Sequence, residues 1–137
     1  MDTNEISAIP LFRDVPRSRR ADLARLADRL SLPAGRVMAR QGALAREFFV
    51  IVDGTAAVVR DGHCIAVLGA GDFFGEIALM SGLRRTATVV AASDVDVIVL
   101  ARREFATMLS EFPEIASAII DAASRRVVAT LRAVEAA

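Results

Sequence analysis

The segment from Phe73 to Thr88 holds the residue types that could bind an anion. It contains Gly75 and Gly82, a run of helix-forming residues between them, and then Arg84 and Arg85. A short helix that begins after Gly75 would present unpaired backbone N–H groups and the positive end of its dipole at one point. Gly75 lets a ligand approach the backbone closely, and the guanidinium of Arg85 offers paired donors to a phosphate. The segment is therefore typical of an anion-binding site.

Glu76 narrows the kind of anion. A carboxylate beside a phosphate site repels the ligand unless the ligand donates a hydrogen bond to it. A ribose hydroxyl is such a donor, so a molecule that brings a phosphate to Arg85 and a hydroxyl to Glu76 is a nucleotide. Taken singly, Arg85 could form a surface salt bridge and Glu76 could merely favour the helix dipole. Their combination with Gly75 indicates a nucleotide site.

The composition excludes several other chemistries. All 17 basic residues are arginine, and without lysine neither a Schiff base nor a GxxxxGK[ST] phosphate loop can form. The one histidine, His63, and the one cysteine, Cys64, are neighbours and cannot supply the ligands of a zinc site or a converging nucleophilic triad. We expect a turn or strand edge there. A cupin-like enzyme would need several histidines, so we expect no catalytic residues, no metal and no cofactor.

Charge and cysteine usage bear on partners and location. The 17 acidic residues cancel the 17 basic ones, which removes the electropositive footprint of a protein that holds nucleic acid by its phosphates. A lone cysteine fits a reducing compartment. The N-terminus is acidic where a signal peptide would be basic, and no apolar run approaches the ~18 residues that span a bilayer. We expect a cytoplasmic chain with no direct nucleic-acid partner and no membrane span.

Three kinds of element must position this segment. We expect a single domain over residues 1–137, with N-terminal helices in 1–31, a β-roll in 32–101 and C-terminal helices in 102–137. The spacing of apolar residues predicts a helix over 17–30. Short apolar runs separated by glycine-bearing turns then indicate antiparallel strands. The fold class is α+β, mainly β: an antiparallel β-roll or jelly-roll barrel with a short helix in the anion-binding segment and a C-terminal helical lid.

The individual elements follow from turns and periodicity. The pairs Asp53-Gly54 and Asp61-Gly62 are the hairpin signal that needs positive φ. A short helix is predicted over 103–110, and Pro113 suits the first turn of a long final helix. That helix is apolar on two sides, so we expect it to pack against the roll and against a second chain. The predicted strands cover residues 36–40, 47–52, 55–60, 64–68, 86–92 and 95–100.

The sequence resembles the cyclic nucleotide-binding domain family. The run FGEIALMSGLRRTATV is similar to that family's phosphate-binding cassette, and LPAGRVMARQG, FFVIVDGTAAV and LGAGDFFGE resemble its β-roll. The resemblance covers nearly the whole chain. It implies that Glu76 accepts the ribose 2′-hydroxyl and that Arg85 pairs with the cyclic phosphate. It also implies that the sugar and phosphate are lined by the backbone of Gly75, Ile77, Ala78 and Ala87.

The resemblance also implies contacts to the base. Thr86 would add its hydroxyl to the phosphate or the purine, which is compatible with cAMP and with cGMP. Val58, on a roll strand, would form a wall for the base. The final helix would close the pocket through residues 125–128, with Arg126 stacking its guanidinium plane on the purine.

Three features depart from the family pattern. Arg84 stands where members commonly have proline, and adds a positive charge near the phosphate. The segment 43–47 looks one residue shorter and less acidic than usual, and we expect neither feature to touch the pocket directly. The sequence ends at Ala137, so we expect no helix-turn-helix of the kind that follows this fold in transcription factors of the catabolite-activator type.

Two interpretations follow. In the first, the chain is a regulatory module that binds a cyclic nucleotide, cAMP before cGMP, and responds by moving its last helix. Its partners would be the small molecule and an attached effector domain or a second copy of the chain. In the alternative, the roll is degenerate, binds no nucleotide, and serves protein interaction or dimerisation through the last helix.

Overall fold

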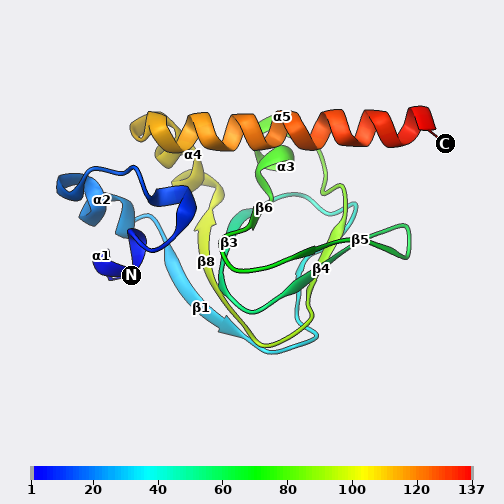
Figure 1. The fold of residues 1–137 in the computed structure, drawn as a ribbon, viewed down its shortest axis with the longest axis horizontal. Coiled ribbons are helices and arrows are strands. Elements are labelled where there is room, and N and C mark those ends of the chain that lie inside the picture. The colour runs from blue at the N-terminus through cyan, green and yellow to red at the C-terminus, as the bar shows by residue number, and fades with distance from the viewer. Residues whose placement is uncertain (1, 137) are drawn as a thin grey trace.

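The structure, a computed structural model, describes the backbone of residues 2–136 and the side chains of residues 2–129 (Figure 1). Two antiparallel four-stranded sheets form its centre, with the strand orders β1-β8-β3-β6 and β2-β7-β4-β5. They confirm the expected α+β roll, as two sheets rather than one closed barrel. The strands are β1 (Asp28–Leu32), β2 (Val37–Ala39), β3 (Glu47–Asp53), β4 (Ala56–Arg60), β5 (His63–Leu68), β6 (Phe73–Phe74), β7 (Thr88–Ala91) and β8 (Val95–Ala101).

Helices lie at both ends of the chain and once within the roll. The N-terminal ones are α1 (Thr3–Ile6), η1 (Pro10–Phe12), η2 (Arg17–Arg19) and α2 (Arg20–Ala24). The short α3 (Glu76–Ser81) connects β6 to the segment before β7. The C-terminal ones are α4 (Arg102–Glu111) and α5 (Pro113–Ala136), and Figure 1 shows α5 running past α3 along one side of the roll.

Strand β8 is buried on both faces and joins two apolar clusters. Its residues Val95, Val97 and Val99 point into the cluster between the two sheets. Ile98 and Leu100 point the other way, into the cluster formed with the terminal helices. Successive side chains of a strand alternate between faces, so the continuous apolar run from Val97 to Leu100 suits a strand that has a core on each side. This strand ties the roll to the helices that flank it.

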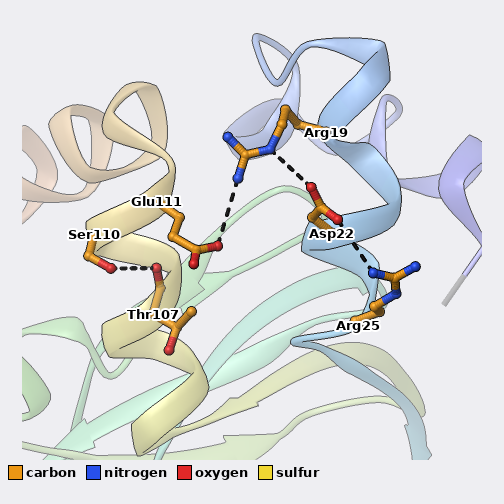
Figure 2. A network of polar contacts seen from close by, with 6 residues as sticks. All are labelled: Arg19, Asp22, Arg25, Thr107, Ser110 and Glu111. Atoms are coloured by element: carbon orange, nitrogen blue, oxygen red, sulfur yellow. Dashed lines mark hydrogen bonds and ion pairs between the residues drawn. The ribbon is translucent and has the colours of Figure 1, made fainter.

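The N-terminal and C-terminal helices contact each other on the side of β8 that carries Ile98 and Leu100 (Figure 2). Arg19 donates to Asp22 over 3.1 Å, lies 3.7 Å from the carboxylate of Glu111 on α4, and sits 4.7 Å from the ring centroid of Phe112. These charged groups are two-fifths to one-half exposed. Exposed pairs of this kind contribute little to stability, typically ~0–1 kcal/mol. The buried cluster beneath them, with Phe12, is the main attachment between α2 and α4.

The prediction of a helix over 17–30 is wrong in its second half. Helical structure ends at Ala24, and Asp28–Leu32 forms β1, which pairs with β8. The roll therefore begins at residue 28 rather than at the expected 32. The two-residue strand β6 was also not predicted. The other strands and both C-terminal helices lie where expected, and Asp61 (φ +51°) with Gly62 (φ +80°) forms the predicted hairpin turn.

Over residues 113–129, whose side chains are described, the final helix buries one of its two apolar stripes and exposes the other. Ile115 and Ile119 are fully buried against the terminal cluster. Ile120, Val127 and Val128 are between two-fifths and one-half exposed. Leu131 and Val134, whose spacing continues these two stripes, lie outside the residues whose side chains are described. Within residues 2–136, no helix combines the length and the apolar character needed to cross a membrane.

Candidate functional site

Gly75 makes the turn between β6 and α3. Its φ is +101°, in the region that residues with a side chain rarely adopt, and it forms the N-cap of α3. A Cβ atom at this position would lie 2.6 Å from Nη1 of Arg85 and 2.9 Å from the carbonyl oxygen of Glu47. Glycine is therefore required by the backbone and by the guanidinium that lies against it.

Arg85 is a buried cation that contacts carbonyl oxygens. Its exposed fraction is 8%, and its Nη2 donates to the carbonyl of Glu47 over 2.6 Å while Nη1 donates to that of Gly75 over 3.4 Å. Burial lowers the pKa of this guanidinium, and the negative charges of Glu47 and Glu76 oppose that effect. No ion pair joins Arg85 to a carboxylate among residues 2–129. A buried charge held only by neutral acceptors is well placed to pair with an incoming anion.

The segment before β3 holds the backbone of Arg85. The N–H of Arg85 donates to the carbonyl of Ala43 over 2.8 Å, and the N–H of Gly42 donates to the carbonyl of Arg85 over 2.9 Å. Beside it, the exposed Arg84 forms a β-bridge with Leu44 and donates to the carbonyl of Gly42 over 3.1 Å. The expectation that residues 43–47 do not touch the site is wrong, because this segment positions Arg85. The bridge also supports the approach to Arg85 where the family commonly has proline.

Glu76 is a fully buried carboxylate in the first turn of α3. Its exposed fraction is 0%, and Oε1 pairs with Nη1 of Arg126 on α5. Its other oxygen, Oε2, is buried and accepts no hydrogen bond within the part of the chain that the structure describes. An unpaired buried acceptor costs free energy, about 1–3 kcal/mol when one partner of a hydrogen bond is missing. Oε2 is thus open to a donor from a ligand.

Arg126 links the last helix to this carboxylate. Besides its pairing with Glu76, it donates through Nη2 to the carbonyl of Phe73 over 2.6 Å, and its Cζ lies 5.1 Å from the centroid of the Phe73 ring. The sequence predicts that the guanidinium plane of Arg126 stacks on a purine. In this structure the guanidinium lies over Phe73 and contacts the residue predicted to bind the ribose.

The remaining predicted residues surround the same turn. Ala78 and Ala87 are buried, whereas the side chain of Thr86 is exposed. Val58 lies on β4 opposite Val89 of β7 and packs against the cluster between the sheets. Ile77 is half-buried on α3.

Three residues that contact the predicted site residues were not identified from the sequence. The carbonyl of Glu47 anchors Arg85, the backbone and ring of Phe73 hold Arg126, and Arg60 donates through Nε to the carbonyl of Thr86 over 3.1 Å. Backbone carbonyls carry no sequence signal, and an aromatic residue such as Phe73 is typical of a core position. Arg60 is two residues after Val58 on the same strand, which is the signal that could have identified it. Over the described residues, no group of three histidine, cysteine or acidic side chains could hold a metal ion.

Gly75→Ala should weaken ligand binding at this site. The added methyl group would displace Arg85 from the turn, and a loss of about 1–3 kcal/mol at such a backbone position corresponds to a roughly 5- to 150-fold rise in Kd. Gly82→Ala is the matched control, because Gly82 also has positive φ (+72°) at the other end of α3 but has open space around its Cβ position. Calorimetric titration of both variants checks this. Equal Kd values for the two would show that Gly75 does not position Arg85.

Comparison with protein families and with known proteins is consistent with this geometry. The family described as "Cyclic nucleotide-binding domain" matches residues 29–112. A cyclic nucleotide-gated potassium channel of Rhizobium etli is 38% identical over 121 residues, which are 88% of this chain and 34% of the channel. The chain thus spans about a third of that relative's length.

Solved structures show the same architecture. PKAR CBD2 bound to Sp-2Cl-cAMPS superposes with a TM-score of 0.78 at 26% identity, covering 94% of this chain and 88% of that one. The catabolite activator protein of Thermus thermophilus gives a TM-score of 0.80 at 24% identity, covering 92% and 62% of the two chains, which is a likeness of fold.

Proposed function

Because this chain belongs to the cyclic nucleotide-binding domain family, we propose that it binds a cyclic nucleotide at the turn formed by Gly75, with cAMP as the first ligand and cGMP as the second. The cyclic phosphate pairs with Arg85, and the ribose 2′-hydroxyl donates to Glu76. The backbone of Ile77, Ala78 and Ala87 lines the sugar and phosphate. We place Thr86 beside the phosphate or purine and Val58 against the base.

One observation carries the proposal. A fully buried carboxylate oxygen, Oε2 of Glu76, has no donor in the described structure, and the adjoining glycine carbonyl contacts a buried guanidinium, that of Arg85, whose acceptors are neutral. A ligand that satisfies both must bring a hydroxyl donor and an anion within a few ångströms. A ribose that carries a cyclic phosphate has this pair of groups on one rigid ring system. Charge-assisted hydrogen bonds of this kind are the strong ones in proteins.

The output of the module is a movement of α5. The ribose hydroxyl donates to Oε2 of Glu76 while Arg126 pairs with Oε1 of the same carboxylate, so a bound ligand shares the negative charge of Glu76 and weakens the contact that holds α5 against α3. Released from Glu76, the guanidinium of Arg126 can stack on the purine, as the sequence predicts. A ligand shifts such an equilibrium only by its difference in affinity for the two positions of the helix. The resulting function is regulatory and non-catalytic, in the cytoplasm, within a single domain over residues 1–137.

Thermal unfolding followed by circular dichroism tests the proposed binding. A ligand that binds only the folded state at 100 times its Kd adds about 2.7 kcal/mol to the free energy of unfolding and raises Tm by several degrees. We expect this rise with cAMP and cGMP. Linear 5′-AMP is the control, because its phosphate is not fused to the ribose ring. No rise at millimolar cyclic nucleotide would favour the alternative, in which the exposed stripe of Ile120, Val127 and Val128 serves association with a partner chain.

Arg126→Ala should release α5 in the absence of ligand. The substitution removes the ion pair to Glu76 and the hydrogen bond to Phe73, and leaves a buried carboxylate without its partner. Hydrogen exchange of the α5 amides around residues 118–129 should therefore speed up in the ligand-free variant. Arg125→Ala, which removes the neighbouring exposed arginine, is the control and should exchange like the wild type. If Arg126→Ala also exchanges like the wild type, this contact does not hold the helix.

A further inference from the structure

Arg60 lies on the face of β4 that borders the proposed pocket. Strands β4 and β7 pair in an unbroken antiparallel register, with Ala56 opposite Ala91, Val58 opposite Val89 and Val59 opposite Thr88. Extended by one position, this register sets Arg60 opposite Ala87. Directly opposite residues of an antiparallel pair share a face, and so do residues two apart on one strand. Arg60 therefore shares its face with both Val58 and Ala87.

The guanidinium of Arg60 is held in place at one edge only. Its Nε donates to the carbonyl of Thr86 over 3.1 Å, which fixes the side chain against the segment that follows Arg85. Its terminal nitrogens, Nη1 and Nη2, take part in no hydrogen bond or ion pair among the described residues. They form a planar pair of donors, positioned by Nε and half-buried at the edge of the site.

A fixed pair of donors distinguishes the two purines. The N7 and O6 atoms of guanine are adjacent acceptors, and arginine binds them in a bidentate manner. Adenine presents N7 beside an amino group, which is itself a donor, so a guanidinium can make one hydrogen bond there and faces an unfavourable donor at the other position. A guanidinium near the base wall thus favours guanine over adenine.

We propose that Arg60 is a specificity-determining residue that contacts the base through Nη1 and Nη2 and admits cGMP to this pocket. The inference rests on the proposed function, because it takes the phosphate to lie at Arg85 and the base to lie along β4 at Val58. Arg60 does not replace Arg85 as the phosphate partner. It adds selectivity at the base end of the pocket, beside Val58 and Thr86.

Calorimetric titration with cAMP and cGMP tests the role of Arg60 through the ratio of the two Kd values. Arg60→Ala should raise the Kd for cGMP about tenfold more than the Kd for cAMP, the effect of one discriminating contact of ~1.4 kcal/mol. Arg60→Lys keeps the charge and the aliphatic stem but loses the planar pair, and should shift the ratio in the same direction. Arg84→Ala is the control: this arginine also donates to a backbone carbonyl near the site, and its loss should leave the ratio unchanged.

The outcomes separate this inference from the proposed function. Binding of both nucleotides by every variant, with an unchanged ratio in Arg60→Ala, overturns the role in selectivity. An equal rise of both Kd values overturns it as well, since Arg60 would then act on the phosphate or on the position of Thr86. Failure of the wild type to bind either nucleotide overturns the proposed function and this inference with it. Unchanged Tm values for the variants would show that the fold is intact.

Discussion

Arg85→Ala should raise the Kd for cAMP about 30- to 150-fold, a loss of ~2–3 kcal/mol for hydrogen bonds to a charged group. The guanidinium is held within the turn by the carbonyls of Glu47 and Gly75, so it pays little entropy when the phosphate arrives. It is also buried, and the phosphate would add a charged acceptor to its neutral ones. The loss should appear with both cAMP and cGMP, because the phosphate is common to them. Calorimetric titration of the variant measures it.

Two further variants separate a phosphate contact from a general effect of charge. Arg84→Ala removes the exposed neighbouring arginine and should change the Kd only slightly, since exposed charges are screened by solvent and salt. Arg85→Lys keeps a charge but not the planar fork, and should recover part of the affinity. If cAMP bound Arg85→Ala as tightly as the wild type, Arg85 would not be the phosphate partner.

Glu76→Ala should raise the Kd for cAMP about tenfold or more, and Glu76→Gln should raise it less. The alanine variant removes both acceptor oxygens, whereas glutamine retains one oxygen that can accept from the ribose hydroxyl, as a neutral and weaker acceptor. Because Glu76 is fully buried, water cannot readily replace the acceptor that the alanine variant lacks. This increases the expected difference in Kd between the alanine and glutamine variants.

The pairing of Glu76 with Arg126 complicates the single variants, and a double-mutant cycle resolves it. Either substitution of Glu76 also removes the partner of Arg126, which changes the ligand-free state. In the Arg126→Ala background the ion pair is already absent. The loss of affinity caused by Glu76→Ala in that background therefore reports the ribose contact alone. Equal affinity of wild type, Glu76→Gln and Glu76→Ala would remove Glu76 from the site.

One of the two hairpins predicted from Asp-Gly pairs is present, since its signal is local; the other is wrong, because Asp53-Gly54 joins β3 to β4, which lie in different sheets. Asp61-Gly62 adopts the positive φ values that a tight hairpin needs, and the strands on either side of it pair as expected. The alternation of Val95, Val97 and Val99 predicted a half-buried strand, and the structure also buries Ile98 and Leu100 on the opposite face of β8.

The first strand was missed because its residues also fit a helical pattern. Leu30 continues the spacing of three and four set by Leu23, but it belongs to β1 and lies opposite Val97 of β8. The hydroxyl of Ser31 donates to Asp96 over 2.6 Å and helps to fix this pairing. Pairing with a distant strand overrode the local pattern, a contribution that propensity does not contain.

The residue types of the proposed site follow from the sequence, whereas the contacts that these residues make in the structure do not. Gly75, Glu76 and Arg85 lie within eleven positions, so their spacing carries a signal. The contact of Glu76 with Arg126 joins residues 50 positions apart and depends on the path of α5 past α3. The hydrogen bonds that hold Arg85 go to backbone carbonyl groups, which every residue has. The sequence therefore contains no signal for these contacts.

Titration calorimetry of the wild-type chain with cAMP tests the central claim most directly, since a protein without tryptophan or tyrosine offers little intrinsic fluorescence. Two temperatures should be used, because burial of apolar surface changes the binding enthalpy with temperature and at least one titration will give measurable heat. The account predicts saturable binding at one cAMP per chain, lost or strongly weakened in Arg85→Ala. No saturable heat at either temperature with millimolar cAMP would contradict it.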